Sequence, residues 1–157
     1  MEATANHTNA ILLIGIGNTT RGDDGLGWAL AEAVEALQLP GVTVAYRQQL
    51  QVEDALLLQQ YPIAVFADAS VEPVPGGAAL LPCIAAPQSF SSSHHQSPAT
   101  LLYLAQTLYG AQPQAWVLAL QAASFELQEG LHAAARNSLQ QGLLCWNEWW
   151  AAQGIAS

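Results

Sequence analysis

Residues 11–27 read ILLIGIGNTTRGDDGLG, and this stretch decides the fold that the sequence predicts. Residues 11–16 are continuously apolar rather than alternating, which is typical of a strand buried on both faces. Five of the chain's 12 glycines also lie in the stretch, and apolar residues return after it at helical spacing. The stretch therefore predicts a strand, a tight glycine loop and a helix. Asp23 and Asp24 stand where the loop becomes the helix.

The rest of the chain continues this alternation of strands and helices. Strands are predicted at residues 10–16, 42–46, 63–67, 78–84 and 116–120, and helices at 25–38, 52–60, 98–109 and 131–152. This order predicts one α/β domain over residues 10–152, with a mostly parallel, five-stranded twisted sheet and helices on both faces. Residues 1–9 are polar and are expected to form a disordered or flexible N-terminus.

The composition excludes several classes of function. The 157 residues include 12 acids, three arginines and no lysine, which gives a net charge of −9. Such a surface repels nucleic acid and anionic lipid, so no nucleic-acid partner is predicted. No apolar run reaches the roughly 18–20 residues that cross a bilayer, and the polar N-terminus does not resemble a signal peptide. We therefore expect a soluble, cytoplasmic protein without a membrane partner.

Three polar segments follow predicted strands. They are the loop at residues 18–24, Asp68 after the third strand, and His94 with His95 after the fourth. In open α/β sheets, ligands bind outside the carboxyl ends of the strands, near the point where strand order reverses. The convergence of these segments, rather than any single residue, predicts a functional site at that edge.

The glycine loop does not fit a nucleotide site. The third glycine of a GxGxxG fingerprint would fall at Thr20, so the dinucleotide-binding pattern fails. Two acids at the start of the helix would also repel a pyrophosphate. A phosphate-binding P-loop is excluded because the chain has no lysine.

Each acid has a structural interpretation beside the functional one. Asp23 could cap the helix at residues 25–38, which needs only one carboxylate. Asp24 beside it would then be available for a cation or for a proton shared with a substrate, either of which relieves the repulsion between adjacent carboxylates. Asp68 could simply accept hydrogen bonds from nearby amides, or it could be the partner of Asp24.

The histidines complete a possible metal site. His94 and His95 could be ordinary exposed side chains of a serine-rich loop. Alternatively, one of these imidazoles joins Asp24 and Asp68 in a mixed nitrogen and oxygen site with open positions, which suits nickel, zinc or manganese. His7 and His132 have no such neighbours in the predicted arrangement and are expected to be surface residues.

These residues carry a resemblance to a known family. The spacing Gly-x-Gly-Asn-x4-Asp-Asp-Gly-x-Gly at residues 15–27 resembles the N-terminal signature of the [NiFe]-hydrogenase maturation endopeptidases. Further segments resemble this family in the same order: FADA at 66–69, SSH at 92–94 with PATLL at 98–102, and FELQEGL at 125–131. The sequence departs from the family at Gln128, where a glycine is usual, and at His132, where a serine is usual. The resemblance implies that residues 10–152 form a hydrogenase maturation protease-like domain.

The resemblance also implies a reaction. Members of the family remove a C-terminal extension from the large-subunit precursor of a [NiFe]-hydrogenase after nickel has been inserted. By position, Asp24, Asp68 and His94 would be the catalytic and nickel-binding residues, with His95 as the alternative to His94. The nickel would be presented by the substrate rather than bound permanently. The resemblance implies an aspartic or metal-dependent endopeptidase. A serine or cysteine protease is not expected, since neither a Gly-x-Ser-x-Gly elbow nor an activated cysteine is visible.

Two other functions fit the same residues. The first is a non-enzymatic nickel carrier or assembly chaperone for a hydrogenase. The second is a different metal-assisted hydrolase on the same fold. A carrier would leave the length of its partner unchanged, whereas a protease would shorten it.

Overall fold

The computed structural model of the chain describes residues 10–87, 96–123 and 130–154. The strands are β1 (Ile11–Ile16), β2 (Val42–Arg47), β3 (Ile63–Ser70), β4 (Ala78–Pro82) and β5 (Gln114–Gln121). The α-helices are α2 (Leu26–Ala36), α3 (Asp54–Leu58), α4 (Pro98–Tyr109) and α5 (Ala133–Ala152), and the short 3-10 helices are η1 (Gly22–Gly25) and η2 (Pro75–Gly77). No helix in these described ranges is long and apolar enough to cross a membrane.

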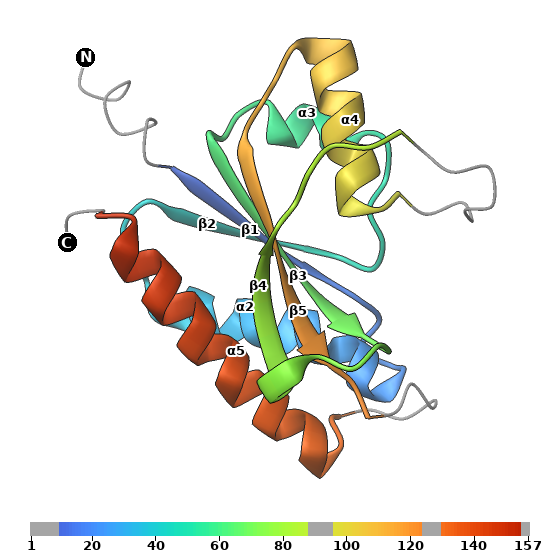
Figure 1. Cartoon of the computed structure of the whole chain (residues 1–157), viewed down its shortest axis with the longest axis vertical. Coiled ribbons are helices and arrows are strands. Elements are labelled where there is room, and N and C mark those ends of the chain that lie inside the picture. Colours follow the sequence, from blue (N-terminus) through green and yellow to red (C-terminus); the bar gives the residue numbers. More distant parts are fainter. Residues whose placement is uncertain (1–9, 88–95, 124–129, 155–157) are drawn as a thin grey trace.

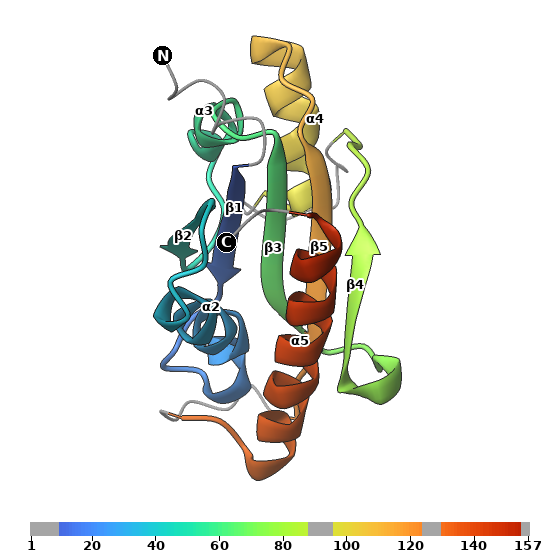
Figure 2. The same cartoon turned by 90° about the vertical axis from the view of Figure 1, so that its left-hand side faces the viewer.

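The strands form one five-stranded sheet in the order β2-β1-β3-β5-β4. All neighbouring pairs are parallel except β4 and β5, which are antiparallel. Figures 1 and 2 show α2 and α5 on one face of the sheet and α3 and α4 on the other. The predicted fold class, a mostly parallel sheet with helices on both faces, is therefore confirmed.

The sheet separates two apolar cores, and β1 contributes to both. Ile11 and Leu13 belong to the core beneath α2 and α5, whereas Leu12 and Ile14 belong to the core beneath α3 and α4. All four side chains are fully buried. Because successive side chains of a strand point to opposite faces, a continuous apolar run is what a strand covered on both sides needs.

β4 corrects one expectation of the sequence analysis. The segment that joins β3 to β4 is residues 71–77, and a crossover between parallel strands needs a dozen or more residues. β4 therefore pairs with β5 in the antiparallel sense, with Ala78 opposite Leu120. The carboxyl end of β4 therefore lies at the opposite end of the sheet from the carboxyl ends of β1 and β3. The expectation that the histidine loop begins at the site edge is wrong.

β3 is longer than the sequence predicts. Its ladder with β5 continues through Asp68, which lies opposite Ala119, as far as Ser70. Asp68 is thus inside the strand rather than in the loop after it. The polar composition of this end favours a loop, but the long neighbouring strand β5 supplies hydrogen-bond partners and keeps the backbone extended.

Candidate active site

The glycine turn, residues 17–25, brings Asp24 against the end of β1. Gly17 has φ +143°, and a Cβ atom at this position would collide with the carbonyl oxygen of Asp24. A Cβ atom at Gly27 would likewise collide with the carbonyl oxygens of Ile16 and Ala67, so α2 begins in direct contact with β1 and β3. Glycine is therefore required here for close backbone approach.

Asp24 lies in η1 and is half-buried. Its Oδ2 accepts a hydrogen bond from the backbone N–H of Asn18 at 2.9 Å. Burial raises the pKa of the Asp24 carboxyl, while the Asn18 N–H and the positive charge of Arg21 act in the opposite direction. The turn thus fixes the carboxylate at its Oδ2 atom.

Asp68 reaches the same place from β3. Burial and the negative charge of Asp24 raise the pKa of Asp68 to about 7, and the backbone N–H of Ala69 partly opposes this shift. The Asp68 carboxyl therefore changes between its acid and carboxylate forms in the neutral pH range, which is the behaviour of a group suited to proton transfer.

Both carboxyls line a pocket of about 480 Å³. The pocket lies where the order of the strands reverses, between the end of β1 and the end of β3, as expected for an open α/β sheet. The remaining lining residues are Ile16, Gly17, Asn18, Arg21, Gln48, Gln49, Leu50, Gln96, Ser97 and Pro98. The segment at residues 96–98, which leads into α4, thus returns to the site edge.

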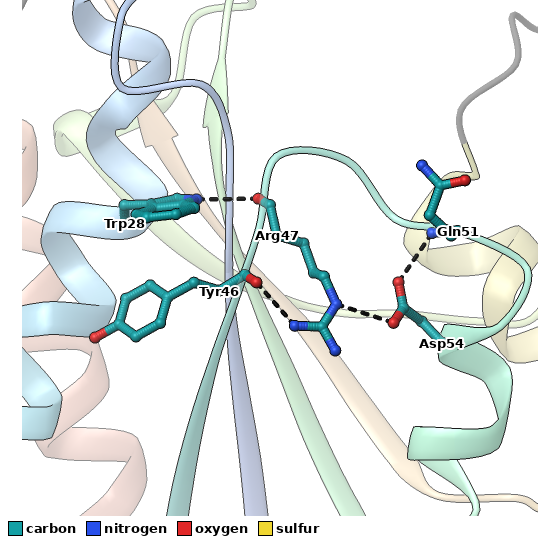
Figure 3. Close-up of polar contacts among 5 residues, drawn as sticks. All are labelled: Trp28, Tyr46, Arg47, Gln51 and Asp54. Carbon is teal, nitrogen blue, oxygen red and sulfur yellow. Dashed lines mark hydrogen bonds and ion pairs between the residues drawn. The ribbon is translucent and has the colours of Figure 1, made fainter.

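Figure 3 shows the polar contacts that hold the end of β2 and the segment after it. The carbonyl oxygen of Arg47 accepts a hydrogen bond from the Trp28 indole N–H at 3.0 Å. The Arg47 guanidinium donates to Asp54 at 3.0 Å and to the carbonyl oxygen of Tyr46 at 2.8 Å. Asp54 in turn accepts the backbone N–H of Gln51 at 2.9 Å.

The ion pair between Arg47 and Asp54 fixes both ends of the segment at residues 47–54. Gln48, Gln49 and Leu50 lie between those ends and form one wall of the pocket. The sequence analysis did not single out this wall. The rule that found Asp68, which looks for polar residues after a strand, would also have selected Gln48 and Gln49, because they directly follow β2.

Asp23 does not cap α2, contrary to the structural interpretation considered above. The residue before α2 is Gly25, and it makes no side-chain capping bond. Asp23 is instead fully buried and accepts the backbone N–H of Ala123 at 2.6 Å and that of His132 at 2.7 Å. A sequence pattern could not reveal these donors, since they follow a hundred or more residues later.

His132 is likewise more than the isolated surface residue that the sequence suggested. Its Nδ1 lies 3.7 Å from Oδ2 of Asp23, and its side chain is 40% exposed. It is also the residue directly before α5. The two residues together connect the glycine turn to the start of the last helix.

Solved structures provide the comparison with known proteins, since no protein-family model and no curated protein matches the sequence. The hydrogenase maturating endopeptidase HybD from E. coli is 20% identical, with a TM-score of 0.72 over 92% of this chain and 94% of that chain. The [NiFe] hydrogenase maturation protease HycI from Thermococcus kodakarensis KOD1 is 18% identical, with a TM-score of 0.67 over 90% and 95%. The chain has the fold of the hydrogenase maturation endopeptidases. A solution structure of an endopeptidase from Escherichia coli is similar to the same extent, with 21% identity, a TM-score of 0.74 and coverage of 93% and 94%.

The maturation endopeptidase fold brings together two of the three predicted site residues. Asp24 and Asp68 line one pocket, whereas His94 and its alternative His95 lie outside the described residues. Residues 125–129 of the FELQEGL segment also lie outside them. Within the described part of the chain, no group of three histidine, cysteine or acidic side chains is arranged to hold a metal ion. The three-residue nickel site therefore stays a prediction.

The electrostatic interaction between the carboxyls of Asp24 and Asp68 can be measured by titration of this protein. We expect the ¹³C carboxyl signal of Asp68 to titrate with a midpoint near pH 7. Replacing Asp24 with Asn removes the negative charge that disfavours ionisation, so the Asp68 midpoint should fall in Asp24→Asn. A midpoint that is the same in both proteins would contradict the placement of the two groups in one electrostatic environment.

Proposed function

We propose that this protein is an endopeptidase that removes the C-terminal extension of a [NiFe]-hydrogenase large-subunit precursor after nickel insertion. The observation that carries the proposal is the pair formed by Asp24 and Asp68, both with raised pKa values, in a pocket at the strand-order switch. The fold supports it, since HybD and HycI are named as hydrogenase maturation enzymes. The reaction would take place in the cytoplasm, where such a precursor would be available before assembly.

In this proposal, nickel belongs to the substrate. Asp24, Asp68 and His94 recognise the nickel that the precursor carries and leave coordination positions for the precursor's own ligands. Carboxylate oxygen and imidazole nitrogen form a donor set that suits such a borderline divalent ion. The pocket, about 480 Å³ in volume, provides space for the peptide beside the metal.

Asp68 is suited to the proton transfers of peptide hydrolysis. A water molecule attacks the scissile carbonyl carbon, and the Asp68 carboxylate takes its proton. The same proton then passes to the leaving amine nitrogen as the C–N bond breaks. A general base is most effective when its pKa lies near the working pH, and the pKa of Asp68 is about 7 in the pocket without nickel. When one oxygen of this carboxylate contacts the precursor's nickel, the metal charge lowers the pKa, and the other oxygen takes the proton of the water.

The test is the intact mass of a nickel-loaded large-subunit precursor before and after incubation with the protein. We expect one loss of mass, at the C-terminus, that does not occur with the nickel-free precursor or with Asp24→Ala. The matched control is Glu72→Ala, which removes an exposed acid outside the pocket and should process normally. An unchanged mass together with nickel binding or transfer would contradict the proposal and support the carrier function.

A further inference from the structure

The carboxylate of Asp23 joins two distant parts of the chain. Ala123, which donates to Oδ2, follows the end of β5, and His132, which donates to Oδ1, directly precedes α5. The Asp23 side chain has no exposed surface. It therefore anchors the glycine turn to both ends of the connection between β5 and α5.

The bonds within the glycine turn hold its shape but do not join it to another element. They are the backbone bonds from Arg21 to Asn18 and from Asp24 to Arg21, both 3.1 Å, and the bonds that the side chains of Asn18 and Asp24 accept inside the turn. Neither Arg21 before η1 nor Gly25 before α2 provides a side-chain cap. The orientation of η1 therefore depends on tertiary contacts. Among the described hydrogen bonds, the two that Asp23 accepts are those that join an η1 side chain to a part of the chain outside the glycine turn.

The two acids leave the turn in different directions. A 3-10 helix has three residues per turn, so consecutive side chains point about 120° apart. Asp23 enters the protein interior, whereas Asp24 lines the pocket. One planar peptide unit joins them, so a fixed Asp23 also limits the rotation of Asp24.

We propose that Asp23 is a positioning residue, whose bonds to Ala123 and His132 hold the Asp24 carboxylate in the pocket beside Asp68. A carboxylate suits this task because it offers one acceptor oxygen to each of the two N–H donors. The start of the 20-residue helix α5 also favours negative charge at this position. The catalytic consequence rests on the proposed endopeptidase function, but the structural consequence does not.

The structural consequence is tested by amide hydrogen exchange of Asp23→Asn, which keeps the size of the side chain but retains one acceptor oxygen. Exchange at Ala123 or His132 should accelerate, because one of these N–H groups loses its acceptor. Positioning adds a second effect. The Asn18 amide, which is bonded to Asp24, should also exchange at least about tenfold faster, normalised to Leu13 in β1. A purely structural role at β5 and α5 would leave Asn18 unchanged, and this result would overturn the proposal.

Two comparison variants make the result specific. Asp54→Asn breaks a similar bond, in which the backbone N–H of Gln51 donates to a carboxylate, and it should accelerate exchange at Gln51 without affecting Asn18. Ala123→Pro removes the N–H group that donates to Asp23 and replaces no residue of the glycine turn. It should accelerate exchange at Asn18 as Asp23→Asn does. This second variant decides the question if Asp23→Asn does not fold.

The catalytic consequence is tested by processing kinetics of Asp23→Asn at a temperature where the variant is folded. We expect kcat to fall at least about tenfold and KM to stay within about twofold, because the pocket wall is intact while Asp24 is less well placed. An unchanged kcat would overturn the catalytic part. If the wild-type protein does not process the precursor, the proposed function fails, and the exchange at Asn18 still decides whether Asp23 positions Asp24.

Discussion

Asp68→Asn is expected to lower kcat for precursor processing by about 10²–10⁴-fold and, above pH 7, to raise the free energy of unfolding. The loss of activity follows because an amide cannot accept the proton of the attacking water. The gain in stability follows because the native protein must hold an ionised Asp68 in a buried place beside Asp24. Activity and stability should therefore change in opposite directions.

The pH dependence of this stability difference follows from the shifted pKa. Folding raises the pKa of Asp68 from 3.8 to about 7. The protonated carboxyl is the form that folding favours, so its contribution is complete below pH 3.8 and is lost as the pH rises through 7. Relative to wild type, Asp68→Asn should gain about 4 kcal/mol as the pH rises between these limits, since the shift is about three pKa units and one unit corresponds to about 1.4 kcal/mol.

Urea unfolding of both proteins at pH 4 and pH 8.5 measures this change. Asp54→Asn is the matched control, because Asp54 is a buried aspartate that is paired with Arg47. That variant should lose about 1–2 kcal/mol at pH 8.5, because it lacks the ion pair with Arg47. If Asp68→Asn is also less stable than wild type at pH 8.5, the assignment of a raised pKa at Asp68 is wrong.

Gly17→Ala is expected to lower the free energy of unfolding by about 3 kcal/mol or more and to abolish processing. The φ angle of +143° is one that residues with a side chain rarely adopt, and the added Cβ would collide with the Asp24 carbonyl oxygen. The colliding atom is backbone, so it can move aside only if the glycine turn moves. Asp24 would then be displaced from the pocket.

Gly76→Ala separates the two causes of this effect. Gly76 also has a positive φ, +76°, but no atom lies within 4 Å of the position that its Cβ would take. Its replacement should cost only about 1–2 kcal/mol, from backbone strain alone, and should leave processing intact. Equal losses of stability in the two variants, measured by urea unfolding, would show that close backbone approach at Gly17 is not important.

The features that the sequence predicted are those encoded in a short stretch. The apolar run of β1 and the proline that begins α4 each specify their element locally, and the predicted bounds of α4, residues 98–109, agree with the structure. The meeting of Asp24 and Asp68 followed from one general rule about the carboxyl ends of parallel strands.

The features that the sequence analysis missed depend mainly on distant partners. The direction of β4 depends on its pairing with β5, and the role of Asp23 depends on N–H groups at Ala123 and His132. Likewise, the pocket wall at Gln48 and Gln49 is fixed by the ion pair between Arg47 and Asp54, which lie on either side of these residues in the sequence. These arrangements arise only once the tertiary structure forms.

The bonds of Asp23 also have a consequence for the order of events during synthesis. Translation proceeds from the N-terminus at about 5–20 residues per second, so the glycine turn leaves the ribosome several seconds before its partner His132. Until then, the turn lacks a bond that the finished protein has. A nascent or prematurely terminated chain can therefore carry both pocket acids without the anchor that fixes the turn, and the site is fully ordered only after His132 has been synthesised and has folded against Asp23.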